Sequence, residues 1–188
     1  LGFSAYDIKY IFLTHGHIDH ILGNYSTVKK YQIPMASHPD GKEYFKTAYA
    51  YAGAFGFSYN DDDTVYPDIN LFDGQIIKIG DDELKVIHTP GHAKGCCCFY
   101  CERQNFIMTG DTLFRRGIGR TDLPGGSYTE IVDSIKNKLY KLPNETVCYC
   151  GHGPETTIGE EKIEVFENID FLTVNPYLGG DSITPFVE

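Results

Sequence analysis

The chain has 188 residues, of which 41% are hydrophobic and 22% charged, and its formal net charge at pH 7 is −10. This length corresponds to one domain, which can bury a core without disulfide bridges. The absence of an apolar run of about 18 residues excludes a membrane-spanning helix, and an acidic chain without a Lys/Arg cluster is not expected to bind nucleic acid or a membrane.

The first part of the chain predicts helices alternating with short strands. Apolar residues predict a buried strand over residues 8–13, and helical spacing predicts a helix from Ile18 to Tyr31. A short strand at Pro34–Ala36 and a helix from Asp40 to Ala54 follow. The acidic run at residues 60–63 predicts a solvated loop.

The second part predicts two β-hairpins and two helices. Alternation of apolar and polar residues predicts two β-hairpins. One pairs Gln75–Ile79 with Leu84–His88, and the other pairs Cys96–Cys101 with Phe106–Thr109. Residues 110–126 contain five glycines and no periodicity, which predicts a loop. Three further elements are expected: a helix at Tyr128–Leu142 with Ser127 as N-cap and Glu130 as its capping-box partner, a strand at Thr146–Cys150, and a helix at Gly159–Val174.

Four glycine-containing segments that follow predicted strands carry histidine or aspartate. They are Thr14-His15-Gly16-His17-Ile18-Asp19-His20, Thr89-Pro90-Gly91-His92, Thr109-Gly110-Asp111-Thr112 and Gly151-His152-Gly153-Pro154. Loops held by a rigid scaffold commonly carry function, and these four can meet at one edge of a sheet. Imidazole and carboxylate groups are the usual ligands of zinc, and they also suit iron and manganese.

The spacing in the first segment allows it to serve two ions. His15 and His17 are two residues apart, so they point the same way in an extended stretch. Asp19 and His20 enter a helix, where the backbone turns and aims them elsewhere. His92 and His152 can complete the two ligand sets. Asp111 can bridge the ions, which lie about 3.5–4 Å apart in two-metal sites.

The remaining histidines and the cysteines favour structural roles. His38 and His88 are each isolated in sequence, as expected for hydrogen-bonded polar side chains. Two cysteine pairs, Cys98/Cys101 and Cys148/Cys150, have spacing that a Cys₄ zinc site could use. Both pairs lie in predicted strands, where Cys98 and Cys101 point to opposite faces, so we interpret the cysteines as small buried thiols.

The metal-ligand pattern resembles that of the metallo-β-lactamase superfamily. His15-x-His17-x-Asp19-His20 matches its signature, and His92, Asp111 and His152 match its later ligand positions in order. Two further stretches, Gly110–Phe114 and Gly151–Thr156, resemble the glyoxalase II-like (hydroxyacylglutathione hydrolase-like) branch. Asn175-Pro176-Tyr177-Leu178 resembles the ending of its small bacterial members.

This resemblance implies a fold and a ligand set. The fold class is α+β, a four-layer αββα sandwich over a single domain, residues 1–188. Only 14 residues precede His15, so we expect the first strands of the sandwich to be missing and the N-terminus to be truncated. The resemblance assigns one ion to His15, His17 and His92, the other to Asp19, His20 and His152, and the bridging role to Asp111.

The expected activity is hydrolysis of a small-molecule thioester or ester by a metal-bridging hydroxide. Two divalent ions, foremost zinc with iron or manganese as alternatives, lower the pKa of the bridging water. Asp19 orients the hydroxide and accepts a proton. The glyoxalase II-like resemblance suggests an S-acylglutathione as substrate.

Three arginines, Arg115, Arg116 and Arg120, follow Asp111. By resemblance Arg120, in Gly117-Ile118-Gly119-Arg120, binds a substrate carboxylate. The alternative for Arg120 is a structural ion pair with Asp122.

Other activities of the same fold stay open to different degrees. A mononuclear iron persulfide dioxygenase shares these motifs, and a non-catalytic metal-binding domain is a further alternative. His17 and the lack of a flavin domain argue against a flavodiiron-type domain. Asp111, where β-lactamases usually carry Cys or Ser, argues against a β-lactamase, as does the lack of a visible export signal. The reduced cysteines and that missing signal predict a cytoplasmic location, and the oligomeric state stays open.

Overall fold

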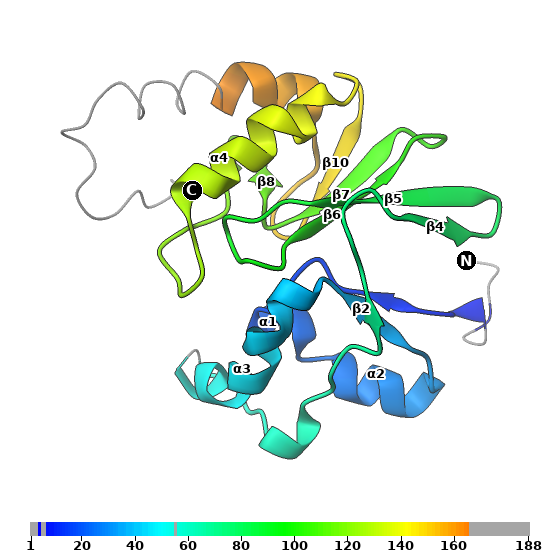
Figure 1. Cartoon of the computed structure of the whole chain (residues 1–188), viewed down its shortest axis with the longest axis vertical. Coiled ribbons are helices and arrows are strands. Elements are labelled where there is room, and N and C mark those ends of the chain that lie inside the picture. Colours follow the sequence, from blue (N-terminus) through cyan, green and yellow to red (C-terminus); the bar gives the residue numbers. More distant parts are fainter. Residues whose placement is uncertain (1–3, 5–6, 55, 166–188) are drawn as a thin grey trace.

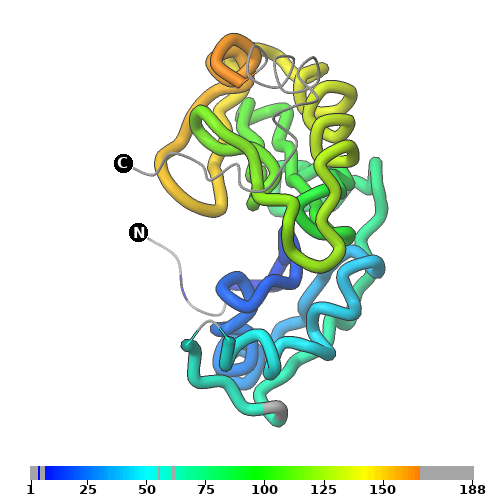
Figure 2. The backbone as a smooth tube through the Cα atoms, turned by 90° about the vertical axis from the view of Figure 1, so that its left-hand side faces the viewer, coloured from blue at the N-terminus to red at the C-terminus, as the bar shows by residue number. Residues whose placement is uncertain are grey.

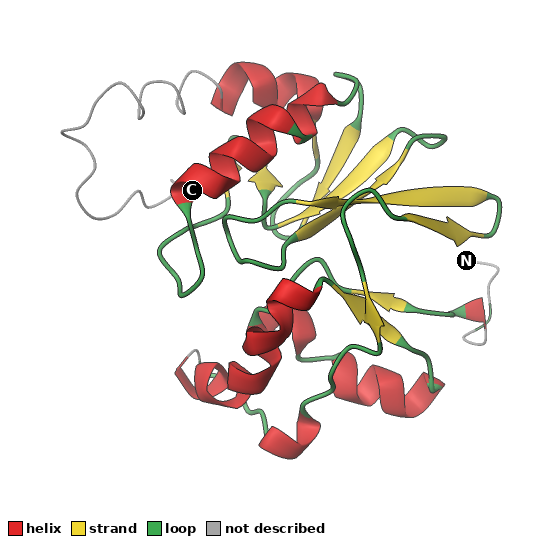
Figure 3. Ribbon diagram, viewed as in Figure 1, coloured by secondary structure: helices red, strands yellow, loops and turns green. Residues whose placement is uncertain are grey.

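Two β-sheets lie face to face between two outer layers of helices (Figures 1 and 3). The structure is a computed structural model that describes residues 4, 7–54 and 56–165. Segments from the N-terminal part of the chain, blue to cyan in Figure 2, form one half, and the segments coloured green to orange form the other. The architecture is the αββα arrangement that the sequence predicts.

The N-terminal half contains the smaller sheet. Its strands are parallel and lie in the order β1 (Ile11–Phe12), β2 (Met35–Ser37), β3 (Ile69–Asn70). The helices of this half are α1 (Ile18–Ile21), α2 (Asn24–Tyr31) and α3 (Lys42–Ala54), with 3₁₀ turns at Pro39–Gly41 and Asp61–Asp63. These helices cover the outer face of the smaller sheet (Figure 1).

The C-terminal half contains a six-stranded sheet in the order β11-β10-β7-β6-β5-β4. Neighbours are antiparallel except for β7 and β10, which are parallel. The strands are β4 (Ile76–Ile79), β5 (Asp82–His88), β6 (Cys97–Cys101), β7 (Phe106–Gly110), β10 (Val147–Cys150) and β11 (Thr156–Thr157). Helix α4 (Tyr128–Asn137), a 3₁₀ turn at Leu139–Lys141 and helical residues 158–165 cover its outer face.

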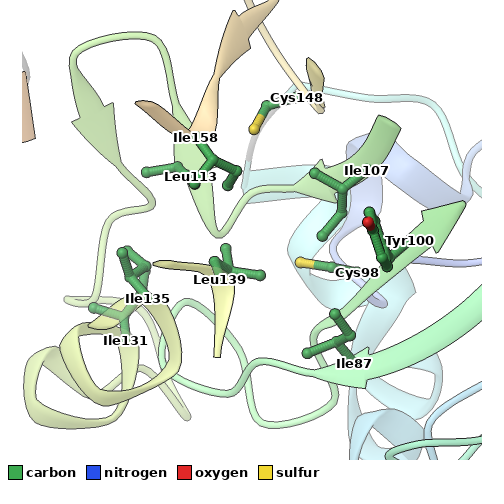
Figure 4. Close-up of a cluster of buried hydrophobic side chains, with 10 residues drawn as sticks. All are labelled: Ile87, Cys98, Tyr100, Ile107, Leu113, Ile131, Ile135, Leu139, Cys148 and Ile158. Atoms are coloured by element: carbon green, nitrogen blue, oxygen red, sulfur yellow. The ribbon is translucent and has the colours of Figure 1, made fainter. Parts of the chain in front are cut away.

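Three apolar clusters separate the four layers. One lies between the larger sheet and its helices (Figure 4) and includes Ile107, Ile131 and Leu139. Another, between the two sheets, includes Val86 and Phe99, and the third packs α1 and α3 on the smaller sheet. Burial of side chains in these three layers supplies the main favourable contribution to folding.

The cysteine-rich strand β6 shows how one strand serves two cores. Cys97, Phe99 and Cys101 face the smaller sheet, whereas Cys98 and Tyr100 face α4. All five side chains are buried, because this strand is covered on both faces. The interpretation of these cysteines as small buried thiols is confirmed for five of them, and Cys150 is half-buried; all six cysteines of the chain are free.

Very short strands and helix breaks account for the differences from the sequence predictions. The segment 110–126, expected to be a loop, contains a small antiparallel hairpin of β8 (Leu113–Phe114) and β9 (Gly117–Ile118). Two-residue strands show no periodicity that a sequence can reveal, and β3 and β11 were missed for the same reason. The helix expected from Ile18 to Tyr31 is interrupted before α2, where Gly23 has a low helix propensity.

Ser127 begins helix α4 as predicted. Its Oγ accepts a hydrogen bond from the Glu130 backbone N–H at 3.3 Å. The reciprocal half of the capping box is replaced, because the Ser127 backbone N–H donates to the Gly91 carbonyl oxygen at 2.7 Å. This bond ties the start of α4 to the loop that carries His92. The helix ends at Asn137, earlier than the predicted Leu142.

The last predicted helix is helical over the described residues 158–165, and its remainder to Val174 lies outside the described residues. Asn175–Leu178 also lies outside them. The expected loss of the first strands stays a prediction. Over the part of the chain that the structure describes, no helix combines the length and hydropathy needed to cross a membrane.

Candidate metal centre

The loops after β1, β5, β7 and β10 place all seven predicted ligands around one point. Each loop follows the end of its strand, and α1 begins within the first of them. The ligand candidates thus brought together are His15, His17, Asp19, His20, His92, Asp111 and His152. The convergence at one edge is as predicted, and which ions these side chains hold stays a prediction.

The first group consists of His15, His17 and His92, whose candidate ligand atoms lie within 4.8 Å of one another. His17 Nδ1 is 2.8 Å from His92 Nε2. Two nitrogens bound to one tetrahedral zinc ion are about 3.3 Å apart, given Zn–N bonds of about 2.0–2.1 Å. These side chains therefore need to move little to hold an ion.

The second group consists of Asp19, His20 and His152, also within 4.8 Å. His152 Nε2 lies 3.0 Å from Asp19 Oδ2 and 3.2 Å from His20 Nε2. The side chain of His152 is 58% exposed, whereas that of His20 is 16% exposed. This side of the centre is therefore the one open to a small molecule.

Asp111 lies between the two groups. Its Oδ1 is 3.3 Å from His20 Nε2, and its Oδ2 is 3.6 Å from His92 Nε2 and 3.5 Å from His152 Nε2. One carboxylate thus approaches ligand candidates of both groups, as a bridging ligand must. His15, His20 and Asp111 form a further candidate group of two histidines and one carboxylate.

Two buried polar atoms in the centre support the fit to metal ions. His15 Nε2 and Asp111 Oδ1 are fully buried and have no hydrogen-bond partner among the described residues. A buried polar atom without a partner costs about 1–3 kcal/mol, more if it is charged. A divalent cation would satisfy both atoms, and the set of imidazole and carboxylate donors is one that such cations bind. The residues present therefore fit a metal centre.

Burial and mutual repulsion keep several imidazoles neutral. Burial and neighbouring histidines lower the pKa of His15, and burial with repulsion from His92 lowers the pKa of His17 to about 4. Burial opposes ionisation of Asp111, but the close approach and attraction of His20 lower its pKa overall. Neutral imidazole and ionised carboxylate are the forms that bind metal.

His20 differs from the other buried histidines. Burial lowers its pKa, but the Asp111 carboxylate, 3.3 Å from His20 Nε2, and the charge of Asp19 outweigh this, so its pKa is raised. In the protein without metal, the two carboxylates therefore attract a proton to the position where a cation would bind.

Two glycines allow the backbone to approach the centre closely. A Cβ at Gly151 would lie 2.1 Å from Asp111 Oδ1, and a Cβ at Gly110 would lie 2.6 Å from the Thr14 side chain. Gly110 also has a φ of 50°, a conformation that other residues rarely adopt. Packing therefore requires glycine at positions 110 and 151.

A cavity of about 700 Å³ opens over the centre. Metal-centre residues including Asp19, His92, Asp111 and His152 form its floor. Its walls are mostly apolar and aromatic, and they include Tyr44, Tyr51, Phe57, Phe114, Ile118, Leu123 and Pro124. Sequence reasoning missed these aromatic residues, because nothing in the sequence distinguishes those that face the cavity from the other tyrosines and phenylalanines of the chain.

Arg120 lines the cavity, but its guanidinium is paired. Nε and one terminal nitrogen each donate to a carboxylate oxygen of Asp122 at 2.7 Å. This is the ion pair given as the alternative in the sequence analysis. The backbone oxygen of Arg120 accepts a hydrogen bond from His92 Nδ1 at 2.7 Å.

His38 and His88 make the structural contacts expected of them. Their rings stack with centroids 3.8 Å apart and planes 7° apart. His88 Nε2 donates to the Lys94 carbonyl oxygen, and His38 Nδ1 accepts from the Asp40 backbone N–H. With Asp40 they also offer ligand atoms within 4.8 Å. However, the lone pair of each imidazole nitrogen lies in the plane of its ring. Because the two rings are stacked and parallel, their lone pairs cannot both point at one ion about 2 Å from each nitrogen.

Comparisons of sequence place residues 1–152 in the family described as the metallo-beta-lactamase superfamily. The probable metallo-hydrolase YqgX of Bacillus subtilis is 35% identical over 174 residues, which cover 92% of this chain and 77% of that protein. Hydroxyacylglutathione hydrolase GloC of Haemophilus influenzae is 35% identical over 165 residues, covering 83% of this chain and 74% of GloC.

Solved structures similar to this one have the same fold. TTHA1623, described in a di-iron-bound form, has a TM-score of 0.75 and 34% identity, covering 82% of this chain and 75% of that one. The B3 metallo-beta-lactamase BLEG-1 has a TM-score of 0.74 and 34% identity, and the match covers 92% of this chain and 78% of BLEG-1. ETHE1 from Myxococcus xanthus has a TM-score of 0.66 and 26% identity, and the match covers 83% of this chain and 60% of ETHE1.

Proposed function

The chain belongs to the metallo-beta-lactamase superfamily, whose members are generally hydrolases that bind divalent metal, and on that premise we propose that it hydrolyses thioesters. The observation that carries the proposal is the position of Asp111 between two ligand groups beneath an open cavity. His15, His17 and His92 would hold one ion, and Asp19, His20 and His152 the other. Ions bound there would supply a Lewis acid and a water of lowered pKa.

Asp19 is the proposed proton acceptor. It lines the cavity, and its side chain is 38% exposed, so it can reach both a bound water and the substrate. Its carboxylate would orient the attacking water and take one proton while oxygen bonds to the carbonyl carbon. The C–S bond then breaks and the sulfur leaves as a thiolate. A thiol has a pKa near about 8.5, so this leaving group needs no general acid.

The proposed substrate is a small thioester of the S-acylglutathione class. Similarity to GloC supports this class, and the cavity has the size of typical small-molecule sites, about 300–1,000 Å³. Its aromatic walls suit the apolar part of an acyl-thiol. Zinc suits the ligand set best, whereas the di-iron form of TTHA1623 supports iron as the alternative. Six free cysteines support a reducing compartment, the cytoplasm.

A mononuclear iron oxygenase is the second candidate. His15, His20 and Asp111 form a group of two histidines and one carboxylate, the ligand set of many non-haem iron oxygenases. Such an enzyme would oxidise a persulfide with O₂. ETHE1 from Myxococcus xanthus, 26% identical, shares the fold of this chain, so the fold is compatible with either candidate.

Metal analysis combined with two assays tests the proposal. The protein is purified without added metal, its zinc, iron and manganese are measured per chain, and thiol release from S-lactoylglutathione is followed. About two ions per chain with thiol release is the expected result. One iron per chain with O₂ consumption on glutathione persulfide would replace the hydrolase by the oxygenase. A β-lactam is assayed in parallel because of the similarity to BLEG-1.

A further inference from the structure

Two arginines, Arg115 and Arg120, are the cationic side chains that line the cavity among the described residues. Arg120 has both of its hydrogen bonds to Asp122 in place, so its charge is already neutralised. Arg115 is an exposed residue, and its guanidinium forms no ion pair with any residue in the described ranges. Within the part of the chain that the structure describes, the cation available to a ligand is therefore Arg115, which differs from the residue that the sequence motif indicates.

The backbone holds Arg115 in a defined place. Arg115 and Arg116 form the turn between β8 and β9, in which Phe114 pairs with Gly117. Arg116 adopts a left-handed conformation with a φ of 61°, and its N–H donates to Glu161 Oε2 at 2.7 Å. Glu161 is only 1% exposed, so the acceptor is fixed. The turn thus presents the Arg115 side chain from a rigid backbone, which lowers the entropy cost of binding.

The charge of the whole chain opposes the approach of an anionic substrate. A net charge of −10 repels anions, and repulsion is reduced only where local positive charge offsets it. The rest of the cavity wall is aromatic or aliphatic. A guanidinium matches a carboxylate with two parallel hydrogen bonds. We propose that Arg115 binds a carboxylate of the substrate, so that the enzyme selects thioesters carrying a negative charge; this inference rests on the proposed function.

Arg116 provides a matched control. It is the adjacent residue and has the same charge, but it does not line the cavity. Its guanidinium lies 3.7 Å from the Glu164 carboxylate. Loss of either arginine changes the net charge by the same amount, so a general electrostatic effect would appear in both variants.

The experiment compares two thioesters that differ by one charge. S-Acetyl-3-mercaptopropionate and its carboxamide are hydrolysed by metal-loaded wild type, R115Q, R116Q and R120Q, and thiol release gives kcat/KM. We expect wild type to prefer the acid about tenfold, because a charge-assisted hydrogen bond is stronger than a neutral one and is only partly screened at an exposed site. R115Q should lose this preference through KM, whereas R116Q should keep it.

Binding measured without turnover separates this inference from the proposed activity. The thioether analogues of both probes, which cannot be hydrolysed, are titrated into the same four metal-loaded proteins by calorimetry. Tighter binding of the carboxylate analogue that R115Q abolishes supports the role of Arg115, even if no thioester is cleaved. Four results would overturn that role. The preference for the carboxylate could be absent in wild type, retained in R115Q, lost equally in R116Q, or lost only in R120Q. Absence of hydrolysis with selective binding would instead contradict the proposed function alone.

Discussion

His92 donates a hydrogen bond from Nδ1 to the backbone oxygen of Arg120 at 2.7 Å. This bond fixes the neutral tautomer in which the lone pair of Nε2 points into the metal centre. The Arg120 side chain in turn makes two hydrogen bonds to Asp122, which hold the same stretch of loop. Residues behind metal ligands commonly set their orientation in this way.

Replacing Asp122 by Asn should therefore weaken metal binding from a distance. Asn can accept only one of the two hydrogen bonds from Arg120, so the carbonyl that orients His92 becomes less constrained. We expect metal affinity to fall about tenfold, at the lower end of the effects seen for such partners. Competition with a chromophoric chelator measures the change. D82N, which disrupts the exposed ion pair with Arg103, is the control, and equal affinities for D122N and wild type would contradict the role.

Asp111→Asn tests the bridging position most directly. The amide keeps the size of the carboxylate but removes the negative charge that faces His20, His92 and His152. Elemental analysis should show fewer than two ions per chain, and kcat/KM should fall by at least about 10²-fold. Full metal content together with full activity would exclude Asp111 as a ligand. Circular dichroism confirms that the fold is retained.

Gly151→Ala should disrupt the centre through contact alone. Its Cβ would lie 2.1 Å from Asp111 Oδ1 and 3.0 Å from the Gly110 carbonyl carbon, so the carboxylate or the backbone has to shift. We expect weaker metal binding and a loss of about 1–3 kcal/mol in the free energy of unfolding. Gly53→Ala is the matched control, because nothing lies within 4 Å of its added Cβ. A G151A variant that behaves like G53A would show that the loop adapts.

Ligand spacing and the periodicity of strands allow much of the fold and the centre to be predicted. His15 and His17 belong to the same ligand group, because side chains two residues apart in an extended loop point the same way. The same alternation directs the cysteines of β6 into two different cores. The role of Arg115 could not be predicted in this way. It depends on a two-residue hairpin without periodicity and on the pairing of Arg120 with a residue two positions away.

The buried cysteines should resist thiol reagents in the folded protein. Burial raises the pKa of Cys98 to about 11 and raises those of Cys97 and Cys148 further, so little thiolate forms at pH 8. Cys150 alone is half-buried. With Ellman's reagent we expect at most one thiol to react quickly and the other five only after unfolding in denaturant. Rapid reaction of several thiols in native buffer would show that this core opens readily.

Glu161 should contribute to the free energy of unfolding at low pH, and this contribution should decline as pH rises. Burial raises the pKa of Glu161, an effect that the hydrogen bonds from Thr156 and the Arg116 N–H only partly offset. The folded state therefore holds its proton more tightly than the unfolded state, whose pKa is about 4.3. The resulting stability is fully present below that value and is lost as pH rises through the folded pKa.

Glu161→Gln removes this titration while keeping the shape of the side chain. Urea unfolding of wild type and E161Q is compared at intervals from pH 4 to pH 8, so that titrations shared by both proteins, including those of metal ligands, cancel. The free energy of unfolding of wild type minus that of E161Q should be largest at pH 4 and should shrink as pH rises. A difference that grows with pH would mean that the ionised carboxylate, through its bond to the Arg116 N–H, is the favoured form. The turn that carries Arg115 would then be held by a charge.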